Sequence, residues 1–254
     1  MRLLIKHCSI VNPGNNYEGF NDIYIEDGVI KLIEPEIVMA AERTIDAAGL
    51  YLMPGFIDMH AHLREPGFEH NETVYSGTRA AARGGYTTIC CMPNTRPVID
   101  DEASLSKLMG IIEKDAAIKV HPIAAISKGQ KSTELVEMDK LFNMGAVAFS
   151  DDGRPVETAA FMMEALLAAK ANDYIIIDHC EELSLAAGGV INQGRQSEKL
   201  GIRGIHPLSE ELSVMRDIMI AEATDFRIHI AHVSTASSAE IIRAAKRRGV
   251  KVTC

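Results

Sequence analysis

The stretch Gly55-Phe56-Ile57-Asp58-Met59-His60-Ala61-His62-Leu63-Arg64-Glu65-Pro66-Gly67 is the most informative part of the sequence. Its apolar first half predicts a strand, and side chains two residues apart on a strand point to the same face. His60 and His62 are therefore placed to bind one metal ion from a rigid element. A His-x-His pair alone is weak evidence for a metal site, so other positions have to support it.

After Tyr51 the sequence alternates between apolar strand patterns and helical patterns, as in a parallel sheet with right-handed crossovers. The expected strands are 51–62, 86–92, 118–125, 146–150, 174–179, 227–232 and 250–254. The expected helices are 74–83, 102–114, 133–144, 158–171, 209–223 and 238–248. This order fits an α/β fold, either a (β/α)8 TIM barrel or an open doubly wound sheet. Neither a G-x-G-x-x-G nor a P-loop motif is present, so a dinucleotide or nucleotide-phosphate site has no support.

The first 51 residues differ from the rest and predict a small β-rich, β-sandwich-like domain. Asp27-Gly28 lies between two apolar runs, which is the signature of a two-residue hairpin turn. The second domain, 52–254, contains seven expected strands, whereas a closed barrel has eight. We therefore expect an eighth strand beyond Cys254 in a longer protein, which an intact mass above 27.7 kDa would reveal.

Composition excludes several classes of function. The net charge of −9 argues against nucleic acid or an anionic membrane surface as the main partner. No apolar run is long enough to cross a bilayer, and the amino terminus lacks the pattern of a signal peptide. The five cysteines are odd in number and form no Cys-x-x-Cys pair, which favours a reducing, cytoplasmic setting.

Three further positions share the setting of the first two histidines. Asp151, His179 and His232 each lie at or just after the carboxyl end of an expected strand, the face where barrel enzymes carry their active sites. Four imidazoles and one bridging carboxylate suit a pair of Zn²⁺ ions, with Mn²⁺, Co²⁺ or Fe²⁺ as weaker candidates.

Simpler explanations exist for each position. A histidine at a strand end is often only a hydrogen-bonded core residue, and Asp151 in an Asp-Asp-Gly sequence could form a turn or a helix cap. The coincidence of all five at one end of the sheet favours the metal site. His229 is expected to be structural, and the other histidines are given no role.

Several motifs together resemble those of dihydroorotases of the bacterial long-chain type, within the amidohydrolase superfamily. The similarity runs along the whole chain and is most specific in Phe56–Gly67, with His-x-His-Leu-Arg-Glu-Pro-Gly at its centre. The later motifs, in the same order, are Met92-Pro93-Asn94-Thr95, Ser150-Asp151-Asp152-Gly153, Asp178-His179-Cys180-Glu181 and His232-Val233-Ser234-Thr235.

The resemblance implies a zinc-dependent cyclic amidase that interconverts N-carbamoyl-L-aspartate and L-dihydroorotate in pyrimidine biosynthesis. By analogy, His60 and His62 hold one zinc, His179 and His232 hold the other, and Asp151 bridges them. A water activated by the two ions would attack the ring amide carbonyl. Arg64 and Asn94 would bind the substrate carboxylate, although a surface salt bridge and a turn residue are the simpler explanations for these two.

The family's general acid is an aspartate at the end of strand eight, so we expect no catalytic acid before Cys254. A polypeptide that ended there is expected to be inactive and poorly folded. The alternatives are a related hydantoinase or allantoinase, or an inactive dihydroorotase-like scaffold for aspartate carbamoyltransferase. A homodimer is a further expectation for the assembly.

Overall fold

The structure is a computed structural model that describes residues 1–254. It divides into two compact units, Met1–Phe56 and Ile57–Cys254. The division lies at Phe56 rather than at residue 51, because Tyr51–Leu52 pairs as a strand with the first strand of the chain. Each unit has its own hydrophobic core.

The first unit is a five-stranded sheet in the order β3-β2-β1-β4, with β5 also paired to β1. Its strands are β1 (Arg2–Asn12), β2 (Tyr17–Glu26), β3 (Val29–Glu34), β4 (Arg43–Asp46) and β5 (Tyr51–Leu52). Asp27 and Gly28 join β2 to β3 with positive φ angles of 50° and 78°, as the hairpin signature predicted. The only helical turn is the 3-10 segment η1 (Pro13–Asn15).

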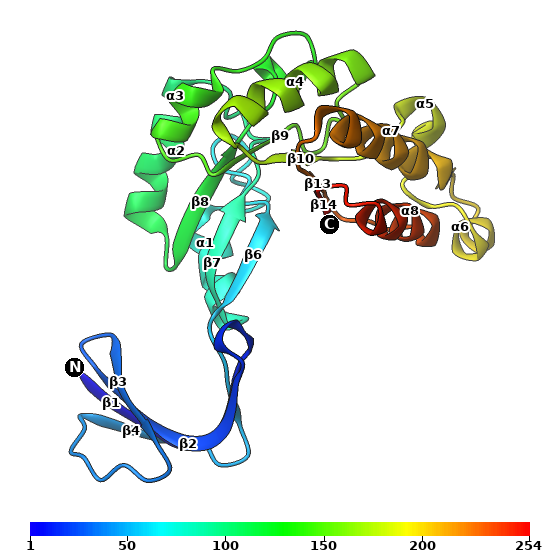
Figure 1. Ribbon diagram of the computed structural model, residues 1–254. Helices are drawn as coiled ribbons and strands as arrows, with labels where there is room; N and C mark the ends of the chain where they lie inside the picture. Colours follow the sequence, from blue (N-terminus) through cyan, green and yellow to red (C-terminus); the bar gives the residue numbers. More distant parts are fainter. The chain divides into compact units, whose positions relative to one another are not determined.

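The second unit is built on a curled seven-stranded sheet in the order β14-β13-β10-β9-β8-β7-β6 (Figure 1). The strands are β6 (Phe56–Ala61), β7 (Tyr86–Cys91), β8 (Lys119–Ala124), β9 (Ala148–Ser150), β10 (Ile176–Asp178), β13 (Ile228–Ile230) and β14 (Val252–Thr253). Pairing from β7 through to β14 is parallel. The sheet therefore has the strand arrangement of a (β/α)8 barrel, and the carboxyl ends of its strands converge on one side.

Helices lie along the outer face of this sheet (Figure 1). They are α1 (Val74–Arg83), α2 (Glu102–Asp115), α3 (Met138–Asn143), α4 (Ala159–Asn172), α7 (Leu208–Thr224) and α8 (Ala236–Arg247). Thr73 and Asp101 are the N-caps of α1 and α2 and form capping boxes. Their side chains accept hydrogen bonds from backbone amides of the first helical turn. No helix is long and apolar enough to cross a membrane.

The strands carry two sets of buried side chains, one on each face. The outer face contributes to the main buried cluster shared with the helices, which includes Phe149 of β9 and Met162 of α4. The inner face carries a smaller cluster contributed by successive strands: Met92, Ile123, Ala148, Ile177 and Ala231. This alternation decides which residues at the strand ends can reach the interior of the barrel.

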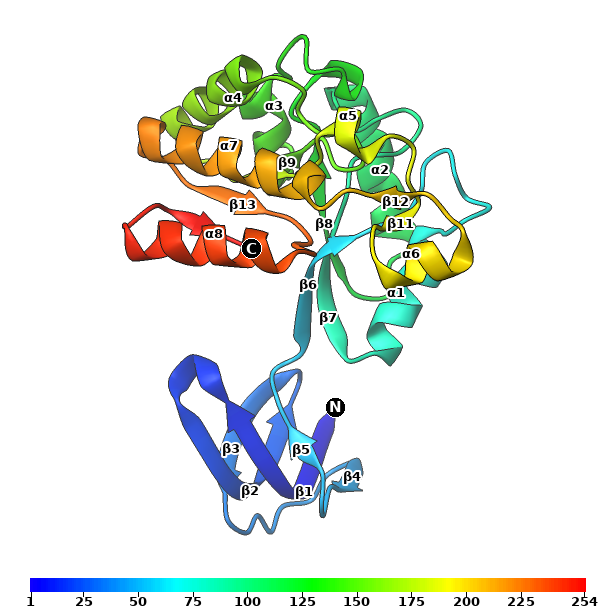
Figure 2. The same cartoon turned by 90° about the vertical axis from the view of Figure 1, so that its right-hand side faces the viewer.

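Three elements differ from the sequence-based expectation. The single strand expected over 51–62 is two strands, β5 and β6, which belong to different sheets. The third helix begins at Met138 rather than at residue 133, because Val136 and its neighbours hydrogen-bond back to the segment around Ser127. The region between the expected strand 174–179 and the expected helix 209–223, for which no element was expected, contains α5 (Leu183–Ala186), β11 (Ile191–Asn192), α6 (Arg195–Leu200) and β12 (Gly204–Ile205). Its two short strands pair in parallel beside α6 (Figure 2).

Candidate metal centre

The two histidines of the opening motif lie at the end of β6. His60 is in the strand and His62 follows it, and their Nε2 atoms are 3.3 Å apart. Both side chains are half-buried and point to the same face, as expected from their spacing on a strand.

The other two predicted histidines come from neighbouring strands and meet the first pair. His179 follows β10 and His232 follows β13, and His179 Nδ1 lies 3.0 Å from His232 Nε2. The ring centroids of His60 and His232 are 5.1 Å apart. The structure therefore brings all four predicted histidines together.

Asp152 is the carboxylate among these histidines. Its Oδ1 lies 3.5 Å from His60 Nε2, 3.5 Å from His179 Nδ1 and 3.2 Å from His232 Nε2. Its Oδ2 lies 3.4 Å from His62 Nε2. With a side chain only 4% exposed, this residue occupies the centre of the cluster.

The prediction that Asp151 joins the histidines is wrong. Its Oδ1 accepts the amides of Ile126 and Ser127 at 2.8 and 3.1 Å, and its Oδ2 accepts the hydroxyl of Ser127. The physical reason is the alternation along β9. Ala148 faces the inner cluster and Phe149 faces the helices, so Asp152 falls on the inner side and Asp151 on the outer side. The alternation puts the two aspartates on opposite faces, but the sequence of so short a strand does not show which face is the inner one.

His232 joins the cluster through an irregular backbone conformation and not through the alternation of a regular strand. Ala231 belongs to the inner cluster, so a regular strand would direct the next side chain outward. His232 instead has a φ of 35°, in the left-handed region, and this backbone turn accompanies its contact with His179. His229 also lies on the inner side, where its Nδ1 is 2.8 Å from the hydroxyl of Thr253.

The cluster shifts the pKa values of its members in opposite directions. Burial opposes ionisation of Asp152, but hydrogen bonds from His179 and His232, together with the charges of the other two histidines, hold its pKa well below the usual range. Burial lowers the pKa of His60 and His62. Burial also disfavours charge on His179, but its contacts with Asp152 and Glu181 outweigh this and raise its pKa.

These donors have the chemistry of a site for divalent metal ions. Neutral imidazole nitrogen and ionised carboxylate oxygen are the ligand types that Zn²⁺ prefers. Ligand atoms of His60, Asp152 and His232 lie within 4.8 Å of one another. A single carboxylate that faces histidines through both of its oxygens is also suited to lie between two ions.

The two predicted substrate-binding residues lie beside this centre. Arg64 is half-buried, has a φ of 60°, and is close enough that its charge adds to burial in lowering the pKa of His62. Asn94 contacts the cluster itself: its Oδ1 lies 3.1 Å from His62 Nδ1, and its Nδ2 donates to Asp152 Oδ2 at 3.3 Å. The amide of Asn94 therefore supports candidate ligands, a role that the sequence did not suggest.

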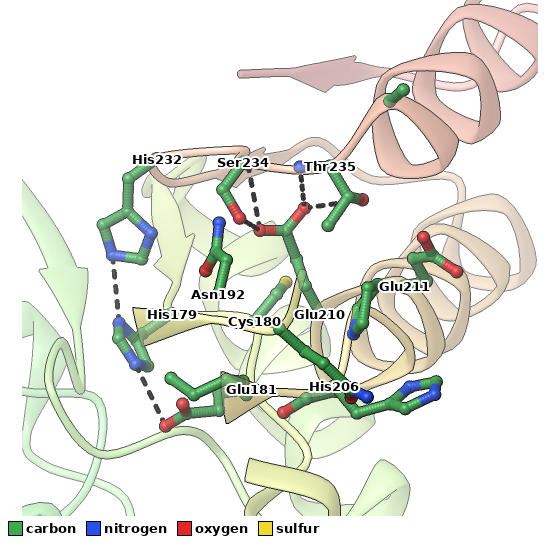
Figure 3. A pocket seen from close by; sticks show the side chains of 15 residues that line it. His179, Cys180, Glu181, Asn192, His206, Glu210, Glu211, His232, Ser234 and Thr235 are labelled. Atoms are coloured by element: carbon green, nitrogen blue, oxygen red, sulfur yellow. Dashed lines mark hydrogen bonds and ion pairs between the residues drawn. The ribbon is translucent and has the colours of Figure 1, made fainter. Parts of the chain in front are cut away.

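A hollow of about 520 Å³ adjoins His179 and His232 (Figure 3). Glu181 lies on its wall with an oxygen 3.6 Å from His179 Nε2. Sequence reasoning also missed Glu210, at the start of α7, whose carboxylate contacts the loop after His232. Glu210 has no sequence signal, because its partners lie 24 and 25 residues away and only the fold brings them near. Glu181 belongs to the quoted motif Asp178-His179-Cys180-Glu181, but it was given no role.

Comparison with known proteins agrees with this geometry. The family model described as Dihydro-orotase-like matches residues 49–238. Curated relatives named dihydroorotase include those of Acetivibrio thermocellus, 48% identical over 252 residues, and Pelotomaculum thermopropionicum, 49% identical over 253 residues. These alignments cover 99% and 100% of this chain, but the chain spans only 59% of either relative.

Solved structures of cyclic amidases have the same fold. L-Hydantoinase (dihydropyrimidinase) from Arthrobacter aurescens superposes with a TM-score of 0.80 at 22% identity, over 99% of this chain and 57% of that one. A D-hydantoinase superposes with a TM-score of 0.78 at 27% identity, over 100% of this chain and 57% of that one. The family match, the TIM-barrel fold and the convergent histidine cluster lead to one conclusion: this chain belongs to the dihydroorotase-like family of cyclic amidohydrolases.

Proposed function

We propose that the protein catalyses the reversible cyclisation of N-carbamoyl-L-aspartate to L-dihydroorotate, with loss of water, in pyrimidine biosynthesis. The observation that carries the proposal is the carboxylate of Asp152 within 3.5 Å of four histidines at the carboxyl end of the barrel strands. Relatives at 48–49% identity that are named dihydroorotase support this substrate. Because they are longer than this chain, the proposal concerns the activity of the whole protein.

The metal centre in this proposal contains two zinc ions. His60 and His62 would hold one, His179 and His232 the other, and Asp152 would bind between them. When bound, such ions lower the pKa of water and polarise a carbonyl group. Contacts with the surrounding histidines outweigh the effect of burial and lower the pKa of Asp152, which favours the ionised form that a metal binds.

Arg64 would bind the substrate, and Asn94 would orient one of the metal-binding histidines. The planar guanidinium of Arg64 suits a bidentate bond to a substrate carboxylate. Asn94 fixes the ring orientation of His62 through Nδ1, in the way that outer contacts orient metal-binding histidines. We assign the general acid for the ring nitrogen to no residue of this chain, and follow the resemblance in expecting an aspartate of an eighth strand.

Two measurements test the proposal together. The purified whole protein, with the expected eighth strand and its aspartate, is analysed for zinc by mass spectrometry and assayed with dihydroorotate, hydantoin and allantoin. We expect about two zinc ions per chain and preference for dihydroorotate, with both properties lost in Asp152→Asn. A preference for hydantoin or allantoin would support the related amidases, whose fold neighbours are named hydantoinases. Metal-free protein without activity would overturn the proposal.

The proposal also includes a cytoplasmic location and two protein partners. All five cysteines are free, which fits a reducing compartment such as the cytoplasm. A homodimer and a complex with aspartate carbamoyltransferase remain predictions. Capture of that transferase by a protein without amidase activity would favour the scaffold function instead.

A further inference from the structure

The first turn of α7 is hydrogen-bonded to the loop that follows His232. One oxygen of Glu210, Oε2, accepts the amide of Ser234 at 2.9 Å and also its hydroxyl. The other, Oε1, accepts the amide of Thr235 at 3.0 Å and its hydroxyl at 3.1 Å. A single half-buried carboxylate thus receives four hydrogen bonds from two consecutive residues (Figure 3).

Ser209, the residue before Glu210, is hydrogen-bonded to the loop after His179. The hydroxyl of Ser209 donates to the carbonyl of Glu182 at 2.9 Å, and the amide of Glu182 donates to the carbonyl of Ser209 at 2.8 Å. The start of α7 therefore contacts both loops that leave the second histidine pair.

His232 is the ligand candidate that most needs such support. Its φ of 35° is unfavourable for a residue with a side chain, and it lies two residues before Ser234. A left-handed turn of this kind persists only where the surrounding structure holds it in place. The four bonds to Glu210 fix the chain directly after the turn.

We propose that Glu210 is a positioning residue for His232: its carboxylate holds Ser234 and Thr235 so that the imidazole keeps its place in the metal centre. The inference rests on the proposed metal-binding function. Thr235 is also the amino-terminal cap of α8, so a purely structural tie between α7 and α8 is the competing explanation. The two explanations differ in whether metal binding depends on Glu210.

The test uses Glu210→Gln, which keeps the size of the side chain but replaces one acceptor oxygen with a donor. Glu211→Gln is the matched control, because it makes the same charge change one residue away, at a carboxylate that faces away from Ser234 and Thr235 (Figure 3). Hydrogen exchange at the amides of Ser234 and Thr235 reports on the bonds themselves. Cobalt(II) titration, followed by its visible absorption, reports on the metal centre.

We expect Glu210→Gln to speed exchange at both amides and to weaken cobalt binding by roughly 10- to 100-fold, the usual effect of losing an outer contact of a metal site. The absorption spectrum of bound cobalt should change as well, and Glu211→Gln should match the unaltered protein in all three measurements. Faster exchange with unchanged cobalt affinity would overturn the inference and leave only a structural tie.

Failure of the proposed metal-binding function gives a different result: the unaltered protein would then bind no cobalt. That result would overturn the inference as well. If Glu210→Gln does not fold, Ser234→Ala replaces it, since this change removes one of the four hydrogen bonds. It should weaken cobalt binding in the same direction but by less, and an unchanged affinity would again overturn the inference.

Discussion

Asp151 and Asp152 are neighbours in the sequence, both buried, and hold different parts of the molecule together. Asp151 ties the end of β9 to the backbone after β8 through the amides of Ile126 and Ser127. Asp152 faces the histidines, whose contacts lower its pKa, whereas burial raises the pKa of Asp151. A carboxylate kept ionised is the better metal ligand, since binding requires the deprotonated form.

Substituting each aspartate by asparagine separates these tasks. Asp152→Asn removes the central negative charge, and we expect its zinc affinity to fall by at least about 100-fold, beyond the effect of losing an outer contact. Asp151→Asn keeps the oxygen that accepts two amides, so it should retain zinc and lower the free energy of unfolding by only about 1 kcal/mol. Zinc content after dialysis and urea unfolding provide the measurements. Retention of zinc by Asp152→Asn with loss from Asp151→Asn would restore the original assignment.

The site residues show which features could be predicted from the sequence and which could not. The four histidines could be predicted because each follows an apolar strand pattern, and parallel strands bring their carboxyl ends together. The choice between two adjacent aspartates needed the face of β9, which a three-residue strand shows poorly. The left-handed turn at His232 and the contact of Glu210 with Ser234 depend on tertiary structure. No local sequence pattern predicts either of them.

At the level of elements, α7 is anchored behind β10 by a buried ionic group. Arg216 donates to Asp217 at 2.7 Å, to Asp178 at 3.3 Å and to the carbonyl of Val156 at 2.7 Å. Burial and the charge of Asp217 raise the pKa of Asp178 well above its ordinary value. One guanidinium therefore joins α7, the strand before His179 and the loop after Asp152.

Removing this guanidinium should be costly. Arg216→Met leaves two buried carboxyl groups without their partner, and we expect the free energy of unfolding to fall by about 3–5 kcal/mol. Arg248→Met, at an exposed pair with Glu222, is the control and should change the free energy of unfolding far less, because water and salt screen an exposed pair. Urea unfolding of both variants measures the difference. Equal losses would show that the buried group contributes no more than a surface pair.

The loop after β6 packs closely against the loop after β7. The amide of Arg96 donates to the carbonyl of Pro66 at 2.9 Å, and a Cβ at Gly67 would come within 2.2 Å of the Arg96 carbonyl oxygen. Gly67 also has a φ of 100°. The glycine of the opening motif therefore allows two loops of the candidate site to meet.

Gly67→Ala tests this contact between loops. Steric overlap adds to backbone strain, so we expect a loss of more than about 2 kcal/mol in the free energy of unfolding. Gly249→Ala is the control, because Gly249 has a φ of 89° but no atom within 4 Å of the added carbon. It should lose about 1 kcal/mol from the backbone term alone. Similar losses in the two variants would mean that the loops separate without cost.

At the scale of the whole molecule, every candidate ligand belongs to the unit Ile57–Cys254. The unit Met1–Phe56 has separate apolar clusters, one around Ile10 and Ile23 and another around Tyr24. Asp22, buried in that unit, accepts the amides of His7 and Ile37 and needs nothing from the second unit for those bonds. Stability gained from a metal should therefore be local.

Zinc binding is expected to stabilise one unit and leave the other unchanged. At free zinc 100 times its dissociation constant, linkage predicts about 2.7 kcal/mol of added stability for a single site. Hydrogen exchange resolved by segment should show this gain at slowly exchanging amides of β7 to β10, with none at those of β1 and β2, and EDTA should reverse it. Equal gains in both units would show that they unfold as one cooperative block. No gain in either unit would show that zinc does not bind the proposed centre, since ions held by the two histidine pairs and Asp152 would have to stabilise the folded chain over the unfolded one.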